Sequence, residues 1–238
     1  MESGAREEME RRVGGDERNV MVRSELARRL RLYVLTDTRV ARGRSLIDLV
    51  GAALEGGATA IQLREKTSSA LEQVALGREL RRLTADAGAL FIVNDRVDVA
   101  CALEADGVHL GQDDLPVAVA RKILGPSAII GGSAGNLGEL AKSLAAGVDY
   151  LGVGPMYPTG TKADAGPAIG PAGLAQIRRQ TDLPIVGVGA IDADNVGPVI
   201  AAGADGAAVI TAVIGAADVK AAARRLRQAV EDALKAKC

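Results

Sequence analysis

The segment QLREK, residues 62–66, combines residue types that can bind an anion. Side chains alternate along a β-strand, so that Gln62, Arg64 and Lys66 lie on one face of the strand that this segment ends. A buried row of amide and cationic groups is costly unless it opens onto an anionic ligand. The row therefore favours an anion site, and the alternative is a strand that simply ends in a solvated loop.

Aspartates end the next two apolar segments. Asp95 ends the segment 89–95, and Asp113 and Asp114 follow the segment after it. Neighbouring strands lie about 4.8 Å apart, so that carboxylates at both strand ends can reach one ion. Mg²⁺ typically takes one or two carboxylates, several waters and phosphate oxygens of a substrate. Asp95 and Asp114 are therefore candidate Mg²⁺ ligands, with helix N-capping as the alternative role, and Asn94 can donate to the same anion.

Eight short β-rich segments alternate with Ala- and Leu-rich segments of helical spacing. They are residues 31–37, 58–65, 89–95, 107–111, 128–134, 150–156, 184–190 and 206–211. Strands that are apolar on both faces, each followed by a helix, indicate a parallel sheet covered on both sides. Eight such units predict an α/β fold, a single-domain (β/α)8 TIM barrel, whose active site lies at the carboxyl ends of the strands. An open doubly wound sheet is the runner-up, but the sequence lacks the Gly-rich turn of a dinucleotide site.

The later strands offer a second anion site. Thr159, Thr161 and Lys162 lie on a Gly-containing loop after the sixth strand, a pattern that alone is more typical of a surface loop. Strands seven and eight end in small residues, among them Ala190 and Thr211. In TIM barrels the loops at these two ends commonly bind a phosphate through backbone N–H groups.

His109 is the only histidine and lies inside the fourth predicted strand. No Ser–His–Asp arrangement accompanies it. We therefore interpret it as a hydrogen-bonded packing residue rather than a catalytic base.

Composition limits the partners of this chain. It has 238 residues, a net charge of −1 and no long block of like charge, which argues against nucleic-acid binding. No apolar segment reaches the roughly 18 residues of a membrane span, and two cysteines without metal or disulfide spacing favour a cytoplasmic setting. We expect small phosphorylated substrates, and a homo-oligomer is compatible with the sequence.

The first 24 residues mix acidic and basic side chains without an apolar centre, unlike signal and transit peptides. We expect residues 1–24 to be a mobile charged extension. Residues 25–238 are expected to form the barrel and to carry the catalytic site.

Six motifs together resemble the thiamine-phosphate synthase family, in order and at the family's spacing. They are QLREK (62–66), VND (93–95), ADGVHLGQDD (105–114), YLGVGPMYPTGTK (150–162), PIVGVGAI (184–191) and AGADGAAVI (202–210). The resemblance covers roughly residues 31–234 and implies a transferase on a (β/α)8 barrel. Its implied reaction joins 4-amino-2-methyl-5-hydroxymethylpyrimidine diphosphate to 4-methyl-5-(2-hydroxyethyl)thiazole phosphate, releasing pyrophosphate.

The resemblance also implies roles for individual residues. The pyrimidine diphosphate would be bound by Gln62, Arg64, Lys66, Asn94, Ser133 and Lys162, the thiazole phosphate by Thr159, Thr161, Ala190, Ile210 and Thr211, and Mg²⁺ by Asp95 and Asp114. The implied mechanism is dissociative: the C–O bond to diphosphate breaks first, and the thiazole nitrogen attacks the cation that results. The catalytic role of Arg64, Lys66 and Lys162 is then to stabilise the charge of the leaving group.

Two positions depart from the family pattern. Gly135 stands where the family usually has His, and Ala190 stands where it usually has Gly. We expect the first change to weaken binding or rate, and the second to be mild unless the backbone there has a positive φ. One rival is the sister thiazole tautomerase family, which lacks the acidic pair and relies on that histidine. The other is a non-catalytic barrel that senses a thiamine precursor.

Overall fold

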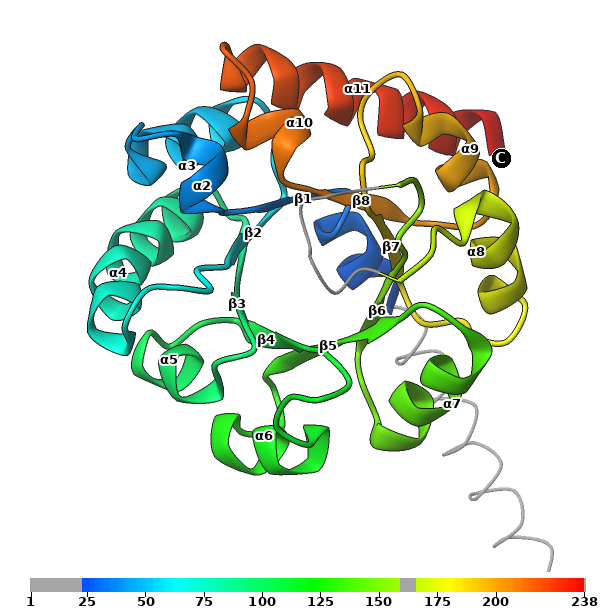
Figure 1. The fold of residues 1–238 in the computed structure, drawn as a ribbon, viewed down its shortest axis with the longest axis horizontal. Coiled ribbons are helices and arrows are strands. Elements are labelled where there is room, and N and C mark those ends of the chain that lie inside the picture. Colours follow the sequence, from blue (N-terminus) through cyan, green and yellow to red (C-terminus); the bar gives the residue numbers. More distant parts are fainter. Residues whose placement is uncertain (1–22, 159–165, 238) are drawn as a thin grey trace, which may run out of the picture.

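The computed structural model describes residues 23–158 and 166–237. Its eight strands form a closed barrel in which each strand pairs in parallel with the next and β8 pairs with β1 (Figure 1). The strands are β1 (Leu32–Leu35), β2 (Ala60–Leu63), β3 (Leu90–Asn94), β4 (Gly107–Leu110), β5 (Ile129–Ala134), β6 (Tyr150–Val153), β7 (Ile185–Val188) and β8 (Gly206–Val209). The predicted (β/α)8 fold is confirmed, and each strand lies within its predicted segment.

Helices surround the ring on its outer side (Figure 1). They are α2 (Thr38–Ala41), α3 (Leu46–Glu55), α4 (Ala70–Asp86), α5 (Val97–Ala102), α6 (Val117–Leu124), α7 (Leu137–Ala146), α8 (Gly170–Arg178), α9 (Val196–Ala201), α10 (Thr211–Ile214) and α11 (Val219–Lys237). In the described part of the chain, none of these helices has the length and apolar character needed to cross a membrane.

Alternation along the strands creates two separate apolar cores. Side chains such as Val34 and Ile61 point outward and pack against the helices. Tyr33, Ile92 and Tyr150 belong to a smaller cluster inside the barrel. Because β1, β2 and β3 are paired in register, Gln62 lies opposite both Leu35 and Ile92 on the inner face.

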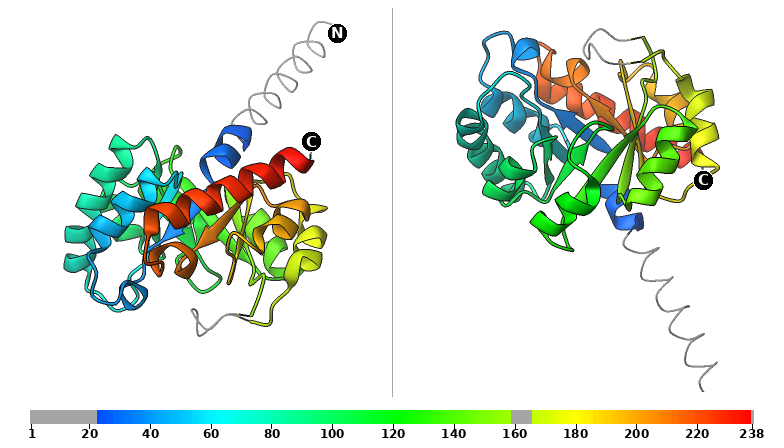
Figure 2. Two further views of the ribbon diagram at one scale, coloured as in Figure 1. Left: turned by 90° about the horizontal axis from the view of Figure 1, so that it is seen from above. Right: turned by 60° about the horizontal axis from the view of Figure 1, so that its bottom comes forward.

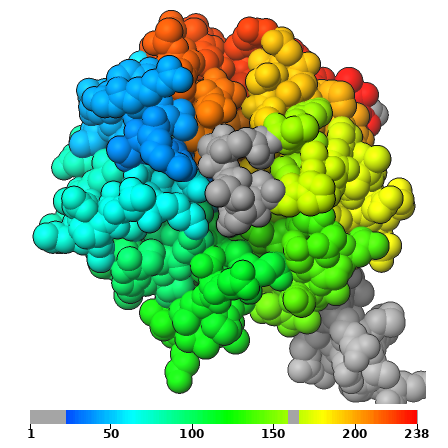
Figure 3. Space-filling model, in the orientation of Figure 1, coloured from blue at the N-terminus to red at the C-terminus, as the bar shows by residue number. Residues whose placement is uncertain are grey.

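A helical segment at residues 23–29 closes one end of the barrel. Leu26 and Leu30 are buried within the interior cluster. Figure 2 shows this segment at the end opposite the short helices α2 and α10, which follow the carboxyl ends of β1 and β8. The end that carries α2 and α10, called the mouth below, faces the viewer in Figure 3. Of the predicted extension, residues 1–24, the structure describes only Arg23 and Ser24, which belong to this segment.

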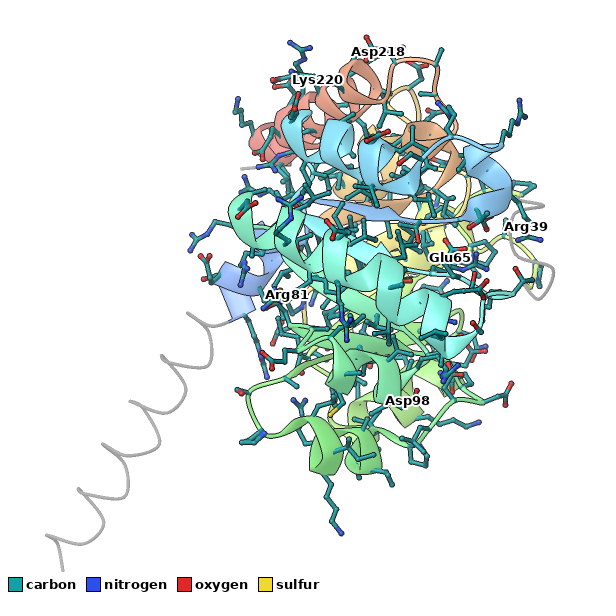
Figure 4. The ribbon with its side chains drawn as sticks, turned by 90° about the vertical axis from the view of Figure 1, so that its left-hand side faces the viewer. Arg39, Glu65, Arg81, Asp98, Asp218 and Lys220 are labelled. Atoms are coloured by element: carbon teal, nitrogen blue, oxygen red, sulfur yellow. The ribbon has the colours of Figure 1, made fainter. Side chains whose placement is uncertain are left out.

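A repeated polar clamp joins the strands in pairs at the end away from the mouth. An aspartate directly before β4, β6 or β8 accepts the backbone N–H near the start of the preceding strand and pairs with a helical arginine. The three sets are Asp106 with Phe91 and Arg81, Asp149 with Ile130 and Arg121, and Asp205 with Ile185 and Arg178. Thr59, before β2, takes the same position, and its Oγ1 accepts the Leu32 N–H at 3.0 Å. Arg81 is seen at this end in Figure 4.

Candidate active site

Arg64 follows β2 on the inner face, and its side chain is only 4% exposed. Its Nη1 donates to Asp37 Oδ2 at 2.8 Å, while its Nε has no hydrogen-bond partner among the described residues. Asp37 follows β1 and caps α2 by accepting the N–H groups of Arg39 and Val40. The buried carboxylate therefore holds the guanidinium in place and leaves a donor for an anion.

Two cationic side chains, Arg64 and Arg39, pair with Asp37. Burial alone would raise the pKa of this carboxyl, but hydrogen bonds from Arg39 and from backbone N–H groups lower it on balance. Arg39 and Glu65 are labelled at the mouth end in Figure 4. Sequence analysis missed Asp37, although it ends the first strand segment as Asp95 ends the third.

Lys66, Asp95 and Asp114 come together at the ends of β2, β3 and β4. Lys66 Nζ donates to Asp95 Oδ2 at 2.6 Å. Asp114 Oδ2 accepts the Gly111 N–H at 2.6 Å, and Asp95 lies close enough to Asp114 to raise the pKa of its carboxyl. Asn94 is the last residue of β3 and lies opposite His109 in the register, which places it on the inner face. The acidic pair and its neighbouring cation are thus close in space, as the sequence predicted.

The alternative role of the two aspartates as helix caps does not fit the structure. The N-cap of α5 is Arg96 and that of α6 is Pro116, and neither helix has a side-chain cap hydrogen bond. Asp95 has φ of 62°, in the left-handed region that only Gly, and to a lesser extent Asn and Asp, adopts at low cost. The carboxylates are therefore not occupied by capping.

The paired carboxylates fit a divalent cation. Burial raises the pKa of Asp114, and the contact with Asp95 raises it further, because two like charges repel in a partly buried place. A cation between them would relieve this repulsion. In the described part of the chain no group of three or more His, Cys, Asp or Glu side chains could hold a metal. Two carboxylates are a donor set that suits Mg²⁺, which typically takes its other ligands from water and phosphate.

A cavity of about 700 Å³ opens beside this charged group. It is lined by the ends of β5 to β8 and by residues 111–113 after β4. Four predicted site residues line it: Ser133, Ala190, Ile210 and Thr211. Most of the lining is small side chains and backbone, a surface that suits an anion held by N–H groups. Gly111 connects the two regions, because it lines the cavity and donates to Asp114.

Three predicted site residues cannot be placed. Thr159, Thr161 and Lys162 lie outside the described residues. The expectations for their contacts with diphosphate and thiazole phosphate therefore remain predictions.

The two departures from the family pattern differ in their backbone. Gly135 lines the cavity, and a Cβ there would lie 3.0 Å from the carbonyl oxygen of Gly154. Ala190 has φ of 49°, in the left-handed region. We expected the change from Gly to Ala to be mild unless the backbone had a positive φ, and the φ here is positive. A residue with a Cβ is strained in this region.

Polar side chains inside the barrel were only partly predicted. His109 is bonded at both ring nitrogens, to Tyr150 and to Ser133, in agreement with its interpretation as a hydrogen-bonded residue. Tyr33 and Tyr150 were missed, although the alternation of β1 and β6 could have placed them inside. The third tyrosine, Tyr157, lies outside this group, and its hydroxyl donates to the Asn195 carbonyl.

Comparison with known proteins identifies the family. The family profile described as thiamine monophosphate synthase matches residues 32–213. The chain belongs to this family. The family and the transferase class predicted from the motifs are therefore confirmed.

Individual relatives agree with this membership. A thiamine-phosphate synthase of Moorella thermoacetica is 60% identical over 199 residues, covering 84% of this chain and 95% of the relative. Another from Methanoculleus marisnigri is 51% identical and covers 84% and 94%. A solved thiamine phosphate pyrophosphorylase from Pyrococcus furiosus is 46% identical, covers 88% of this chain and 99% of its own, and has a TM-score of 0.82. A solved 3-hexulose-6-phosphate synthase, 20% identical with a TM-score of 0.66, shares the fold alone.

Proposed function

We propose that this chain joins 4-amino-2-methyl-5-hydroxymethylpyrimidine diphosphate to 4-methyl-5-(2-hydroxyethyl)thiazole phosphate, giving thiamine phosphate and pyrophosphate. The observation that carries the proposal is the charged group at the mouth. Arg64 is fixed by Asp37 with its Nε unpartnered among the described residues, and the Asp95–Asp114 pair and Lys66 lie at the adjoining strand ends. A diphosphate together with a divalent cation would complete this arrangement of charges.

The chain's own residues act on the leaving group. The C–O bond breaks with its electron pair passing to the diphosphate, and the thiazole nitrogen then uses its lone pair to form the new C–N bond. No proton needs to be removed, so a catalytic base is not required. Arg64, Lys66 and Lys162 donate to the diphosphate as its charge grows, and Asn94 adds a neutral donor. Such preorganised donors typically stabilise a transition state by about 3 to 4 kcal/mol each.

The cavity over β5 to β8 suits the second substrate. Backbone N–H groups near Ala190, Ile210 and Thr211 would bind the thiazole phosphate, together with Thr159 and Thr161. Ser133 lies where the cavity meets the inner barrel and would contact the pyrimidine. This arrangement would bring the two phosphorylated molecules side by side with their reacting atoms between them.

Asp95 and Asp114 would hold the Mg²⁺ ion expected for the family. When bound, the ion supplies positive charge to the departing diphosphate. Lys66 would then be released from Asp95 to donate to the diphosphate as well. The family membership supports this assignment, and so does the mutual repulsion of the two carboxyls.

The decisive assay measures thiamine phosphate formed from the two phosphorylated precursors, with Mg²⁺ and with a chelator. We expect product only when the metal is present. A folded protein that binds the pyrimidine diphosphate and forms no product would instead support the sensor alternative. Isomerisation of a thiazole phosphate without coupling would support the tautomerase alternative.

A substitution in the acidic pair tests the metal site. Asp95→Asn should lower turnover at least about a hundredfold. Asp98→Asn is the matched control, because Asp98 is an exposed aspartate nearby that pairs with Arg96. Near-normal turnover of Asp95→Asn, with the control also normal, would remove Asp95 from the metal site.

We also propose the setting in which this reaction takes place. Residues 25–238 would act as one catalytic domain on small phosphorylated molecules, in the cytoplasm, without nucleic-acid or membrane partners. The near-zero net charge and the absence of a long apolar segment from the sequence support this view. A homo-oligomer is compatible with it, and the mass of the native protein in solution would decide.

A further inference from the structure

Five side chains from five strands form a continuous chain of hydrogen bonds inside the barrel, which we call the relay. It runs from Gln62 to Tyr33 at 2.6 Å, to Tyr150 at 3.0 Å, to His109 at 3.0 Å and to Ser133 at 3.0 Å. Gln62, Tyr33 and Tyr150 are at most 2% exposed. The proposed mechanism uses only the two ends of this chain, Gln62 and Ser133.

The donors and acceptors give the relay a direction. The Gln62 Nε2–H group can only donate, so the Tyr33 oxygen accepts, and the Tyr33 proton is directed to Tyr150. Tyr150 then donates to His109 Nδ1, which leaves the ring proton on Nε2 to be donated to Ser133 Oγ. Burial raises the pKa of Tyr33 and of Tyr150 above the ordinary tyrosine value, so both hydroxyls keep their protons near neutral pH.

The two ends of the relay are thereby linked. Because Gln62 uses its nitrogen for Tyr33, its buried Oε1 is an acceptor without a partner among the described residues. Because Ser133 Oγ accepts from His109, its own proton is directed toward the cavity that Ser133 lines. If one end exchanged its donor for its acceptor, every hydrogen bond in the relay would have to reverse its direction. A buried hydroxyl or ring nitrogen left without a matching partner would be costly.

We propose that the relay is a positioning device that presents Gln62 Oε1 as an acceptor and the Ser133 hydroxyl as a donor to the bound aminopyrimidine. The proposal rests on the proposed function, because an aminopyrimidine has N–H donors on its amino group and lone pairs on its ring nitrogens. Tyr33, Tyr150 and His109 are positioning residues that act through the two ends. They select a substrate by the order of its donors and acceptors.

The neighbouring strands make room for this arrangement. A Cβ at Gly131 of β5 would overlap the Tyr150 ring and lie 2.5 Å from His109 Nδ1. A Cβ at Gly152 of β6 would lie 3.0 Å from His109 Cε1. The Tyr150–His109 pair therefore occupies space that a side chain at Gly131 would fill, and a side chain at Gly152 would crowd His109.

The protein offers a direct test that needs no activity. His109 is the only histidine, so ¹⁵N-histidine labelling of protein without an affinity tag gives a spectrum of this one ring. At about two pH units above the ordinary histidine pKa of about 6.5, we expect the proton on Nε2 and none on Nδ1. Tyr150→Phe should disturb this state, whereas the matched control Tyr157→Phe should leave the spectrum unchanged. A proton on Nδ1 in the wild-type protein would overturn the proposed direction.

A double-mutant cycle tests whether the two ends are coupled. Gln62→Leu, Ser133→Ala and the double variant are compared by kcat/KM for the pyrimidine diphosphate. We expect the double loss to differ from the product of the single losses by about fivefold or more. In the Tyr150→Phe background the loss of kcat/KM in the double variant should equal the product of the single losses within about twofold. In the Tyr157→Phe background the coupling should persist.

The outcomes separate the two proposals. An active wild-type protein with a multiplicative cycle in every background overturns the relay and leaves the proposed function intact. A wild-type protein that forms no thiamine phosphate overturns the proposed function, and the relay's direction is still decided by the ¹⁵N spectrum. Far-ultraviolet circular dichroism of each variant shows whether it has folded.

Discussion

Among single residues, Asp37 shows how one side chain can orient another that would bind the ligand, here Arg64. Arg64 is buried with Asp37 as its only ion-pair partner among the described residues. An arginine in such a place requires a negative partner, because an unpaired buried charge is strongly destabilising. Asp37 supplies this partner before substrate arrives, and an anionic substrate can then bind a guanidinium that is already oriented.

Removing the charge of Asp37 should make the stability of the protein depend on a bound anion. We expect Asp37→Asn to lower the free energy of unfolding by about 2 to 4 kcal/mol, because Arg64 loses its counter-charge. Added pyrophosphate should stabilise the variant more than the wild-type protein, since it replaces the missing charge. Thermal unfolding with and without pyrophosphate measures this difference, with Asp98→Asn as the exposed control. Equal stabilisation of both proteins would show that Arg64 is not the anion's partner.

Ala190 carries strain that glycine would remove. Its φ of 49° costs about 1 kcal/mol for a residue with a Cβ. Ala190→Gly should therefore raise the free energy of unfolding by about 0.5 to 1 kcal/mol, after allowing for the greater freedom of glycine in the unfolded chain. Urea unfolding measures the change. Ala193→Gly, in the same loop, is a useful comparison and should give no such gain.

Sequence reasoning succeeded where the period of a strand decides the answer. Gln62 and Arg64 were placed on one face because alternation is fixed by the backbone, and the pairing of Asp95 with Asp114 followed from strand order. It failed where barrel closure brings distant strands together. Tyr33 and Tyr150 are 117 positions apart and meet only across the interior. No local pattern encodes that distance. The partnership of Asp37 with Arg64 was missed for a different reason: it joins the ends of the neighbouring strands β1 and β2, and Asp37 was not treated as a strand-end acid in the way that Asp95 was.

Within the elements, the repeated clamp explains a pattern that recurs in the sequence. The segments EADGVHLG, AAGVDYLGVG and AAGADGAAVI each place an aspartate directly before a strand. In the structure that aspartate accepts a backbone N–H of the preceding strand and binds a helical arginine. The clamp joins a strand, its neighbour and an outer helix at the end opposite the mouth. It therefore contributes stability where no chemistry takes place, which is the usual division of labour in TIM barrels.

The clamp residues should differ in importance according to the bonds that each makes. Asp149→Ala should lower the free energy of unfolding by about 2 to 3 kcal/mol, because it leaves the buried Ile130 N–H without a partner and also releases Arg121. Thr59→Val should cost less, about 1 to 2 kcal/mol, because the Leu32 N–H loses its acceptor while the Leu32 carbonyl, which loses the hydroxyl donor, keeps the Thr59 N–H. Urea unfolding ranks the two. Activity of the folded fraction should be unchanged in both, and a selective loss of activity would contradict a purely structural role.

For the molecule as a whole, α11 is linked to β1, the strand that closes the barrel by pairing with β8. Glu231 on α11 accepts from Arg31, directly before β1, at 2.6 and 2.7 Å, and from Arg227 at 2.8 Å. Burial alone would raise the pKa of Glu231, but Arg31 and Arg227 lower it on balance. A carboxyl with a lowered pKa stabilises the fold above its unfolded pKa of about 4.3, and this stability is lost as pH falls through the folded pKa.

The contribution of Glu231 should therefore depend on pH in a defined direction. Glu231→Gln should lower the free energy of unfolding at pH 7 by about 1 to 2 kcal/mol. The difference from the wild-type protein should shrink as the pH falls below about 4, because the wild-type carboxyl is then protonated too. Urea unfolding over this pH range provides the measurement. The exposed pair of Glu55 with Lys220 is the control, since Glu55→Gln should change little at any pH.

The relay also gives the protein an optical signal of its own. The chain has three tyrosines and no tryptophan, so its ultraviolet emission comes from tyrosine alone. Two of the three, Tyr33 and Tyr150, lie in the relay with their hydroxyls bonded to each other, and the Tyr150 hydroxyl is also bonded to His109. Substrate binding should therefore change the intensity of the tyrosine fluorescence. Binding to the unlabelled protein can be followed by this intrinsic fluorescence.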